Sequence, residues 1–132
     1  MSKTFTIAIH GAPYSSQASH HGLKLTEALL AQGHEISRVF FFHDGVMNAL
    51  NARVPPQEEQ DQAQGWQALA DTHGVELAVC IANALKRGVV SEAERDRYDT
   101  PTATLAAPFE LVGLGQLIEA IATSDRYVEI PA

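Results

Sequence analysis

Short apolar runs alternate along the chain with longer stretches in which apolar residues recur every three or four positions. The runs are rich in Val, Ile and Phe and predict strands, whereas the longer stretches predict amphipathic helices. The expected strands cover residues 4–9, 35–42, 75–79, 109–112 and the final segment of Tyr127, Val128 and Ile130. The expected helices cover residues 16–32, a short stretch after Asp44, the segment from Trp66 to His73, residues 81–87 and 91–98, and the segment with Leu114, Leu117, Ile118 and Ile121. This alternation predicts an α/β fold, a three-layer α/β/α sandwich with a mostly parallel sheet of about five strands.

The apolar run at residues 39–42 differs from the first strand because its apolar side chains do not alternate with polar ones. A run of this kind is typical of a strand that is buried on both faces, so we expect it in the middle of the sheet. Glycines at positions 33, 74 and 88 follow three of the expected helices and predict where those helices end.

Residues 51–64 form the one stretch of low complexity, with Pro55, Pro56 and a cluster of Gln, Glu and Asp. We interpret this stretch as an exposed loop that leads into the helix carrying Trp66. No internal repeat is visible, and a length of 132 residues predicts a single domain over residues 1–132.

Charge and hydropathy exclude two classes of partner. The formal net charge is -7, which argues against the basic surface that a nucleic-acid-binding protein needs. The longest unbroken apolar run covers the six residues 77–82, far fewer than the roughly 20 that a membrane-spanning helix requires. We therefore expect a soluble protein that binds neither nucleic acid nor membrane directly.

The N-terminal residues and the cysteine content predict the cellular compartment of the protein. They pass from Met1, Ser2, Lys3 and Thr4 directly into an alternating strand pattern, without the apolar segment of a secretory signal. The chain has one cysteine, Cys80, which cannot form an internal disulfide and suits a reducing compartment. Both features predict a cytoplasmic protein.

Cys80 is the strongest candidate for chemistry. Reactive groups of open parallel sheets gather at the carboxyl ends of the strands, where we expect the loop 10–16, the turn 43–45 and Cys80. Cys80 follows a strand and begins a helix, where unpaired backbone amides favour the nucleophilic thiolate. We therefore expect Cys80 near solvent and reactive toward alkylating reagents. The competing interpretation is that Cys80, between Val79 and Ile81, is a small buried hydrophobe.

Four histidines, His10, His20, His21 and His43, are candidates for metal ligands or for a base that activates the cysteine. No pair among them has the spacing of a known metal site, and the two adjacent histidines face different ways on a helix. The sequence therefore predicts solvated or capping histidines and no metal.

Two segments have partial resemblance to ligand-binding motifs. The loop 11–16 has one glycine and lacks the Gly-Lys-Ser/Thr ending of a phosphate-binding loop. Gly113 and Gly115 begin like a dinucleotide fingerprint, but Ile118 stands where its third glycine belongs. A ligand-binding module of flavodoxin-like topology, holding a nucleotide or phosphate in its first loop and having an inert cysteine, therefore stays an alternative, as does a purely structural subunit.

Blocks of residues over nearly the whole chain match a known family. The most specific block, residues 77–89, reads Leu-Ala-Val-Cys-Ile-Ala-Asn-Ala-Leu-Lys-Arg-Gly-Val. Further matches are Gly11 to Tyr14, Ala31 to Glu35, Val39 to Phe41, Gly45, Val46, Asn48, Ala49, the segment 113–117, and Ser124 to Arg126. On these residues the chain resembles the DsrE-like sulphur-relay family.

The resemblance implies a sulfurtransferase in which Cys80 carries sulphur as a persulfide, since the family's cysteine lies at this strand-to-helix junction. It implies that no metal and no organic cofactor is needed. It also implies sister subunits resembling TusB and TusC in a heterohexamer, a sulphur donor resembling TusA and an acceptor resembling TusE. The implied pathway leads to 2-thiolation of the tRNA wobble uridine, and a role in sulphur oxidation, known for related proteins, stays an alternative.

Apolar side chains also bear on assembly. We interpret Trp66 and the aromatic residues Phe40, Phe41 and Phe42 as core rather than as a binding platform. Together with Leu114 they exceed what one small core needs, which predicts an oligomer rather than a monomer.

Overall fold

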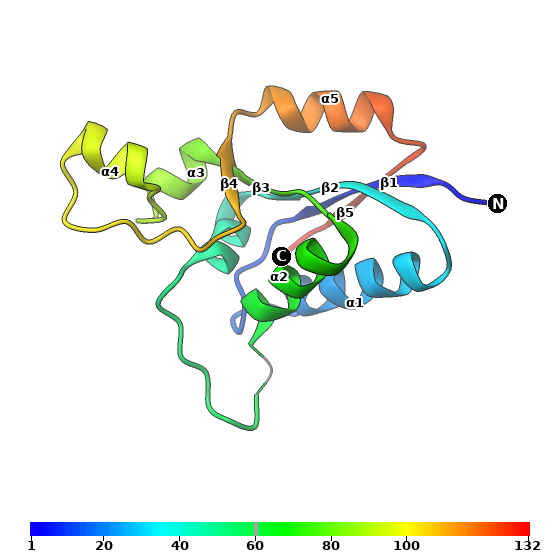
Figure 1. Cartoon of the computed structure of the whole chain (residues 1–132), viewed down its shortest axis with the longest axis horizontal. Coiled ribbons are helices and arrows are strands. Elements are labelled where there is room, and N and C mark those ends of the chain that lie inside the picture. Colours follow the sequence, from blue (N-terminus) through cyan, green and yellow to red (C-terminus); the bar gives the residue numbers. More distant parts are fainter. Residues whose placement is uncertain (60) are drawn as a thin grey trace.

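The computed structural model describes residues 1–59 and 61–132, and within these the chain forms one sheet of five parallel strands (Figure 1). In chain order the strands are β1 (Thr4–Ile9), β2 (Glu35–Phe41), β3 (Leu77–Cys80), β4 (Glu110–Val112) and β5 (Arg126–Ile130). Their order across the sheet is β4-β3-β2-β1-β5, which places β2 at the centre.

The helices lie on both sides of this sheet, so the three-layer sandwich is confirmed. They are α1 (Ala18–Ala31), the 3-10 helix η1 (His43–Ala49), α2 (Gln62–His73), α3 (Ile81–Leu85), α4 (Glu92–Tyr98) and α5 (Gly115–Thr123). Figure 1 shows α1 and α2 covering one face and α5 covering the other, with α3 and α4 beyond the β3 and β4 end of the sheet. No helix in the described parts of the chain is long and apolar enough to cross a membrane.

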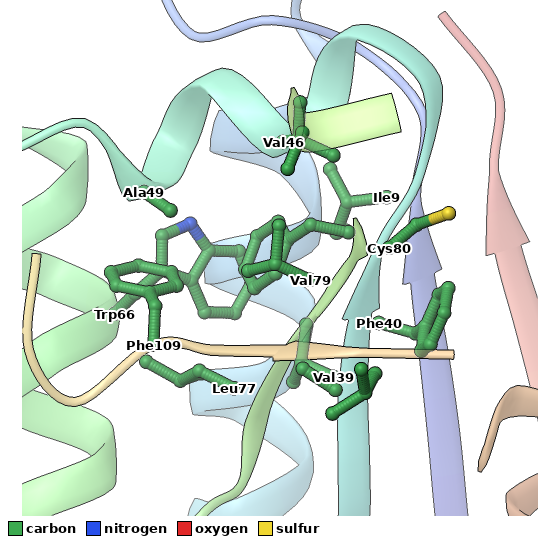
Figure 2. Packing of buried hydrophobic residues seen from close by; sticks show 14 of the residues in the cluster. Ile9, Val39, Phe40, Val46, Ala49, Trp66, Leu77, Val79, Cys80 and Phe109 are labelled. Carbon is green, nitrogen blue, oxygen red and sulfur yellow. The ribbon is translucent and has the colours of Figure 1, made fainter. Parts of the chain in front are cut away.

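The central strand is buried as the missing alternation predicted. Val39, Phe40 and Phe41 have no exposed surface, because β1 and β3 flank β2 and helices cover both faces. On the face toward α2, the Phe41 ring packs edge-on against Trp66 and Phe109, with ring centroids 5.2 and 5.4 Å apart. Figure 2 shows Trp66 and Phe109 in this cluster, where aromatic edge-to-face contacts add to the burial of apolar area.

The start of α2 is set by a capping side chain. Asp61 accepts hydrogen bonds from the backbone amides of Ala63 and Gln64, so the helix begins at Gln62 and the predicted loop 51–64 ends earlier than expected. Gly74 ends this helix in the left-handed conformation, with φ of 69°, as its position predicted. Gln60, within the predicted loop, lies outside the described residues.

Several other elements, including α1, β3 and α3, are one to three residues shorter than expected. The third strand begins at Leu77 instead of residue 75, because that is where pairing with Val39 of β2 begins. Helix α3 ends at Leu85 instead of residue 87, with Lys86 at its C-cap and the turn closed by a hydrogen bond from the Gly88 amide to the Leu85 carbonyl.

The prediction that the chain has more aromatic residues than one small core needs is wrong. Trp66, Phe40 and Phe41 are fully buried, because the two sides of a five-stranded sheet need large side chains to fill the space under the helices. Three exposed apolar side chains lie together on α5 and just before it, where Leu114, Ile118 and Ile121 expose 48%, 64% and 38% of their surface, while Met1 and Val54 are exposed elsewhere.

Candidate functional site

Cys80 lies where β3 ends and α3 begins. It is the last residue of the strand, pairs with Val112 of β4, and is the N-cap residue of the helix. Its backbone is therefore held by the sheet on one side and by the first helical turn on the other. All strands run parallel, so Cys80 lies at the same edge of the sheet as the segments that follow β1 and β2.

The Cys80 side chain lies on the α5 face of the sheet. Successive side chains of a strand alternate between faces, so Cys80 shares the face of Ala78, whose partner on β2 is Phe40. Arg38, two residues before Phe40, donates a hydrogen bond from Nη1 to the carbonyl of Gln116 in α5. Figure 2 shows the sulphur pointing away from Trp66, toward the side that carries Phe40.

The expectation that Cys80 lies near solvent is wrong for the single chain. Only 4% of its surface is exposed, since β3 is an interior strand and the neighbouring β4 pairs with Cys80 itself. The short β4 segment lies thirty residues further along the chain, so the residues around Cys80 contain no sign of this cover. The burial limits access to the sulphur to small or closely docked reactants.

Side-chain contacts of the sulphur come from α3. Asn83 Nδ2 donates a hydrogen bond to Cys80 Sγ at 3.1 Å. Arg87 Nη1 donates to both oxygens of Asn83, Oδ1 and the carbonyl O, each at 3.2 Å. Arg87 Nε in turn pairs with Asp44 Oδ1 of η1 at 2.8 Å. A chain of four side chains thus leads from the surface of the protein to the sulphur.

The sequence predicts only part of this series of hydrogen-bonded side chains. It predicts Asp44 in a turn at the carboxyl edge of the sheet, and Arg87 only as the last residue of the expected helix 81–87. The signal for the contact was present as spacing, because Cys80, Asn83 and Arg87 follow one another at intervals of three and four residues, which on a helical turn brings side chains to one side.

A second cluster of polar side chains lies on the β5 side of the sheet, formed by Tyr127 and Glu129 of β5 and by His10, which directly follows β1. Tyr127 donates its hydroxyl proton to Glu129 Oε1 at 2.8 Å, and His10 Nε2 lies 3.7 Å from the same oxygen. The His10 ring also contacts those of Phe42 and His43, with centroids 5.6 and 5.2 Å apart. Burial, followed by the hydrogen bond and negative charge of Glu129, raises the pKa of Tyr127 to about 12.

This pKa predicts a loss of stability at high pH. The folded protein keeps the Tyr127 proton up to about pH 12, while the unfolded chain loses it near 10.0, so the contribution to stability falls as pH rises through that window. A spectrophotometric titration should show a late phase of tyrosine ionisation, and Tyr127→Phe should remove that phase. Tyr98→Phe, at an exposed site, is the control. A late phase that survives Tyr127→Phe contradicts the assignment.

The candidate histidines lie in two separate parts of the described structure, His10 and His43 at the end of β1 and start of η1, and His20 and His21 in α1. No group of three or more His, Cys, Asp or Glu side chains among the described residues is arranged to hold a metal ion. His20 lines a cleft of about 650 Å³ together with Tyr14, Ser15, Ser16, Gln17, Glu59 and Gln62. This cleft includes the loop of the alternative nucleotide or phosphate site, and its described lining contains the carboxylate of Glu59 and neither Lys nor Arg. Cys80 is not part of this cleft, so the two candidate sites are separate.

Comparison with known proteins decides the family. Residues 3–130 match the sequence model of the DsrE/DsrF-like family. The chain belongs to this family. The chain is 47% identical over 124 residues to the sulfurtransferase TusD homolog of Pseudomonas aeruginosa. The alignment covers 94% of each of the two chains. It is 44% identical over 125 residues to the sulfurtransferase TusD of an Enterobacter species, covering 95% of this chain and 98% of the relative.

The fold comparison agrees with this membership. The ychN protein from E. coli superposes with a TM-score of 0.78 at 22% sequence identity, over 96% of this chain and 98% of that one. At this identity the likeness establishes the fold alone. The DsrE-like resemblance stated from the sequence is thus confirmed, and the near full-length relatives named sulfurtransferase identify the chain as a sulfurtransferase subunit of a sulphur relay.

Proposed function

We propose that the chain, as one relay domain, carries sulphur as a persulfide on Cys80. The observation that carries the proposal is the position of the chain's one cysteine, at the carboxyl edge of the sheet with a hydrogen-bond donor on its sulphur. The family relationship supports it, because a sulfurtransferase needs a group that accepts sulphur. A thiolate is the side-chain nucleophile suited to that step.

The transfer proceeds by thiolate attack on a persulfide. The Cys80 thiolate attacks the outer sulphur of a donor persulfide, R–S–SH, forming a new S–S bond while the donor's own S–S bond breaks. The bonding electron pair leaves with the donor as its thiolate, and the proton stays on the transferred sulphur. An acceptor thiolate then repeats the step on the Cys80 persulfide and releases the Cys80 thiolate unchanged. Each step exchanges one S–S bond for another, so no external oxidant or reductant is used.

For the pathway, we propose a cytoplasmic relay toward 2-thiolation of the tRNA wobble uridine. The donor would resemble TusA, the acceptor TusE, and the sister subunits TusB and TusC. The net charge of -7 supports a subunit that hands sulphur to another protein and does not grip RNA itself.

Deleting the gene in its own host tests this pathway. Mass spectrometry of tRNA nucleosides should show loss of wobble 2-thiouridine, restored by the wild-type gene and not by one encoding Cys80→Ser. Normal 2-thiouridine, together with a defect in the oxidation of reduced sulphur compounds, would place the chain in sulphur oxidation instead.

We also propose that the chain works as an oligomer with its sister subunits, through the apolar residues at α5. Leu114, Ile118 and Ile121 lie four and three residues apart, so they share one exposed face. Light scattering of the chain with its sister subunits should give a mass well above the 14.3 kDa of the single chain.

Two matched substitutions test the role of the α5 face. Ile118→Lys should lower the mass of the assembly, whereas Gln116→Lys, which adds the same charge on the other flank of α5, should not. A 14.3 kDa species at every concentration, even with the sister subunits present, contradicts the proposal.

A further inference from the structure

The amide of Asn83 can present only one of its ends to Cys80. A guanidinium has donors and no acceptor, so the contact of Arg87 Nη1 with the Asn83 side chain requires the amide oxygen to face Arg87. The amide nitrogen, on the other side of the same planar group, then points its N–H at Cys80 Sγ, 3.1 Å away. Arg87 therefore determines which end of the amide the sulphur meets.

Asp44 holds Arg87 in this position from the neighbouring element η1. The Arg87–Asp44 pair is partly exposed, with 25% and 64% of the two side chains accessible, so it adds little to the free energy of folding. The ion pair instead fixes the position of the Arg87 guanidinium. With Nε on Asp44 and Nη1 on Asn83, the guanidinium is fixed at two points.

We propose that Asn83 is a catalytic residue that stabilises negative charge on Cys80 Sγ, and that Arg87 and Asp44 are positioning residues that act through it. The inference rests on the proposed function, in which Sγ is charged twice, as the attacking thiolate and again as the leaving thiolate. In the persulfide the charge moves to the outer sulphur, so the Asn83 hydrogen bond is strongest when Sγ is about to accept sulphur or has just released it. Charge that develops on a reacting atom is where an oriented donor accelerates a reaction.

The size of the effect follows from the strength of such a bond. A hydrogen bond to a charged group such as a thiolate stabilises that charged form by about 10- to 100-fold. On a logarithmic scale, the rate of thiol exchange changes by roughly half as much as the stability of the thiolate does. Loss of the donor should therefore slow release of sulphur from Cys80 by about three- to tenfold.

Cyanide measures the release step without any relay partner. The protein is loaded from glutathione persulfide, and cyanide then attacks the outer sulphur, forms thiocyanate and expels Cys80 Sγ as the thiolate. Asn83→Ala should release thiocyanate about three- to tenfold more slowly than wild type. Alkylation of the unloaded protein by iodoacetamide at neutral pH should also slow, because fewer molecules carry the thiolate.

Asn83→Asp separates a donor from a packing role. Aspartate has nearly the shape of asparagine, so a residue that only fills space would be better replaced by Asp than by Ala. A donor gives the opposite order, because a carboxylate offers no N–H and repels the thiolate. We expect both rates to fall in the order wild type, Asn83→Ala, Asn83→Asp, with Asn51→Ala as a control that removes an amide bonded to a backbone carbonyl elsewhere.

A double substitution tests whether Arg87 acts through Asn83. Arg87→Ala should slow thiocyanate release about twofold to threefold in the wild-type background and add nothing to Asn83→Ala. If Arg87 acted on the sulphur through its own charge, the two losses would multiply. Arg95→Ala is the matched control, since Arg95 also pairs with surface carboxylates but lies on α4.

The outcomes separate this inference from the function on which it rests. If wild type loads sulphur and the folded Asn83 variants release it at the wild-type rate, the role of Asn83 is wrong and the persulfide carrier stands. If wild type loads no sulphur, the carrier function fails. The alkylation rates then still test the donor, because they need no persulfide, and equal rates in all folded variants overturn it.

Discussion

Replacing Cys80 by serine should abolish sulphur uptake while the protein stays folded. A serine hydroxyl is not ionised near neutral pH, and oxygen forms no stable counterpart of the persulfide. Cys80 is buried, yet the new hydroxyl would still have the Asn83 amide as its donor, so no polar group is left without a partner. The free energy of unfolding should therefore fall by no more than about 1 to 2 kcal/mol.

Wild type and Cys80→Ser are loaded side by side from glutathione persulfide, with bound sulphur measured by mass and folding by thermal melting. The expected result is one sulphur on wild type, none on the mutant, and melting temperatures within a few degrees of each other. Sulphur uptake by a folded Cys80→Ser protein would show that Cys80 is not the carrier. Since the chain has no other cysteine, the relay mechanism would fail with it.

Gly45→Ala should strongly destabilise the fold, by more than Cys80→Ser does. A Cβ at position 45 would lie 2.2 Å from the backbone oxygen of Ile9. That oxygen already accepts a hydrogen bond from the Phe42 amide, and the Gly45 carbonyl is held by the Asn48 side chain, so neither segment can move away freely. We expect the free energy of unfolding to fall by roughly 3 kcal/mol and the melting temperature by about 10 °C.

Gly115→Ala is the matched control for this prediction. A Cβ at Gly115 meets no atom within 4 Å, and the residue lies at the start of α5, where alanine is favoured over glycine. Its melting temperature should be unchanged or slightly raised. Equal stability of the Gly45→Ala and Gly115→Ala proteins in thermal melting would contradict the close approach of η1 to the end of β1.

The local sequence pattern predicts a structural feature when that feature depends on residues of the same segment. The unbroken apolar run at residues 39–42 predicted a central strand, and β2 lies at the centre of the sheet with Val39, Phe40 and Phe41 fully buried. Gly74 predicted the end of α2, because the left-handed conformation that ends this helix is one that glycine adopts readily.

Features that depend on distant partners were not predictable from local pattern. The order of the strands and the burial of Cys80 depend on β4, whose three residues pair with β3 residues that lie 32 positions earlier in the chain. The support of the sulphur depends on Asp44 meeting Arg87 across 43 residues. The family resemblance made Cys80 the candidate for the sulphur carrier but assigned no role to Asn83, because a shared residue type does not show which atom its side chain contacts.

Intact mass after exposure to a persulfide, followed by mapping of the modified peptide, tests directly whether Cys80 carries sulphur. The folded wild-type chain is incubated with glutathione persulfide, freed of the donor and weighed before and after addition of a thiol acceptor. We predict a gain of one sulphur atom, located on the peptide that contains Cys80 and lost to the acceptor with return to the original mass. An unchanged mass of the folded chain, or added sulphur that the acceptor thiol cannot remove, would contradict a persulfide carrier.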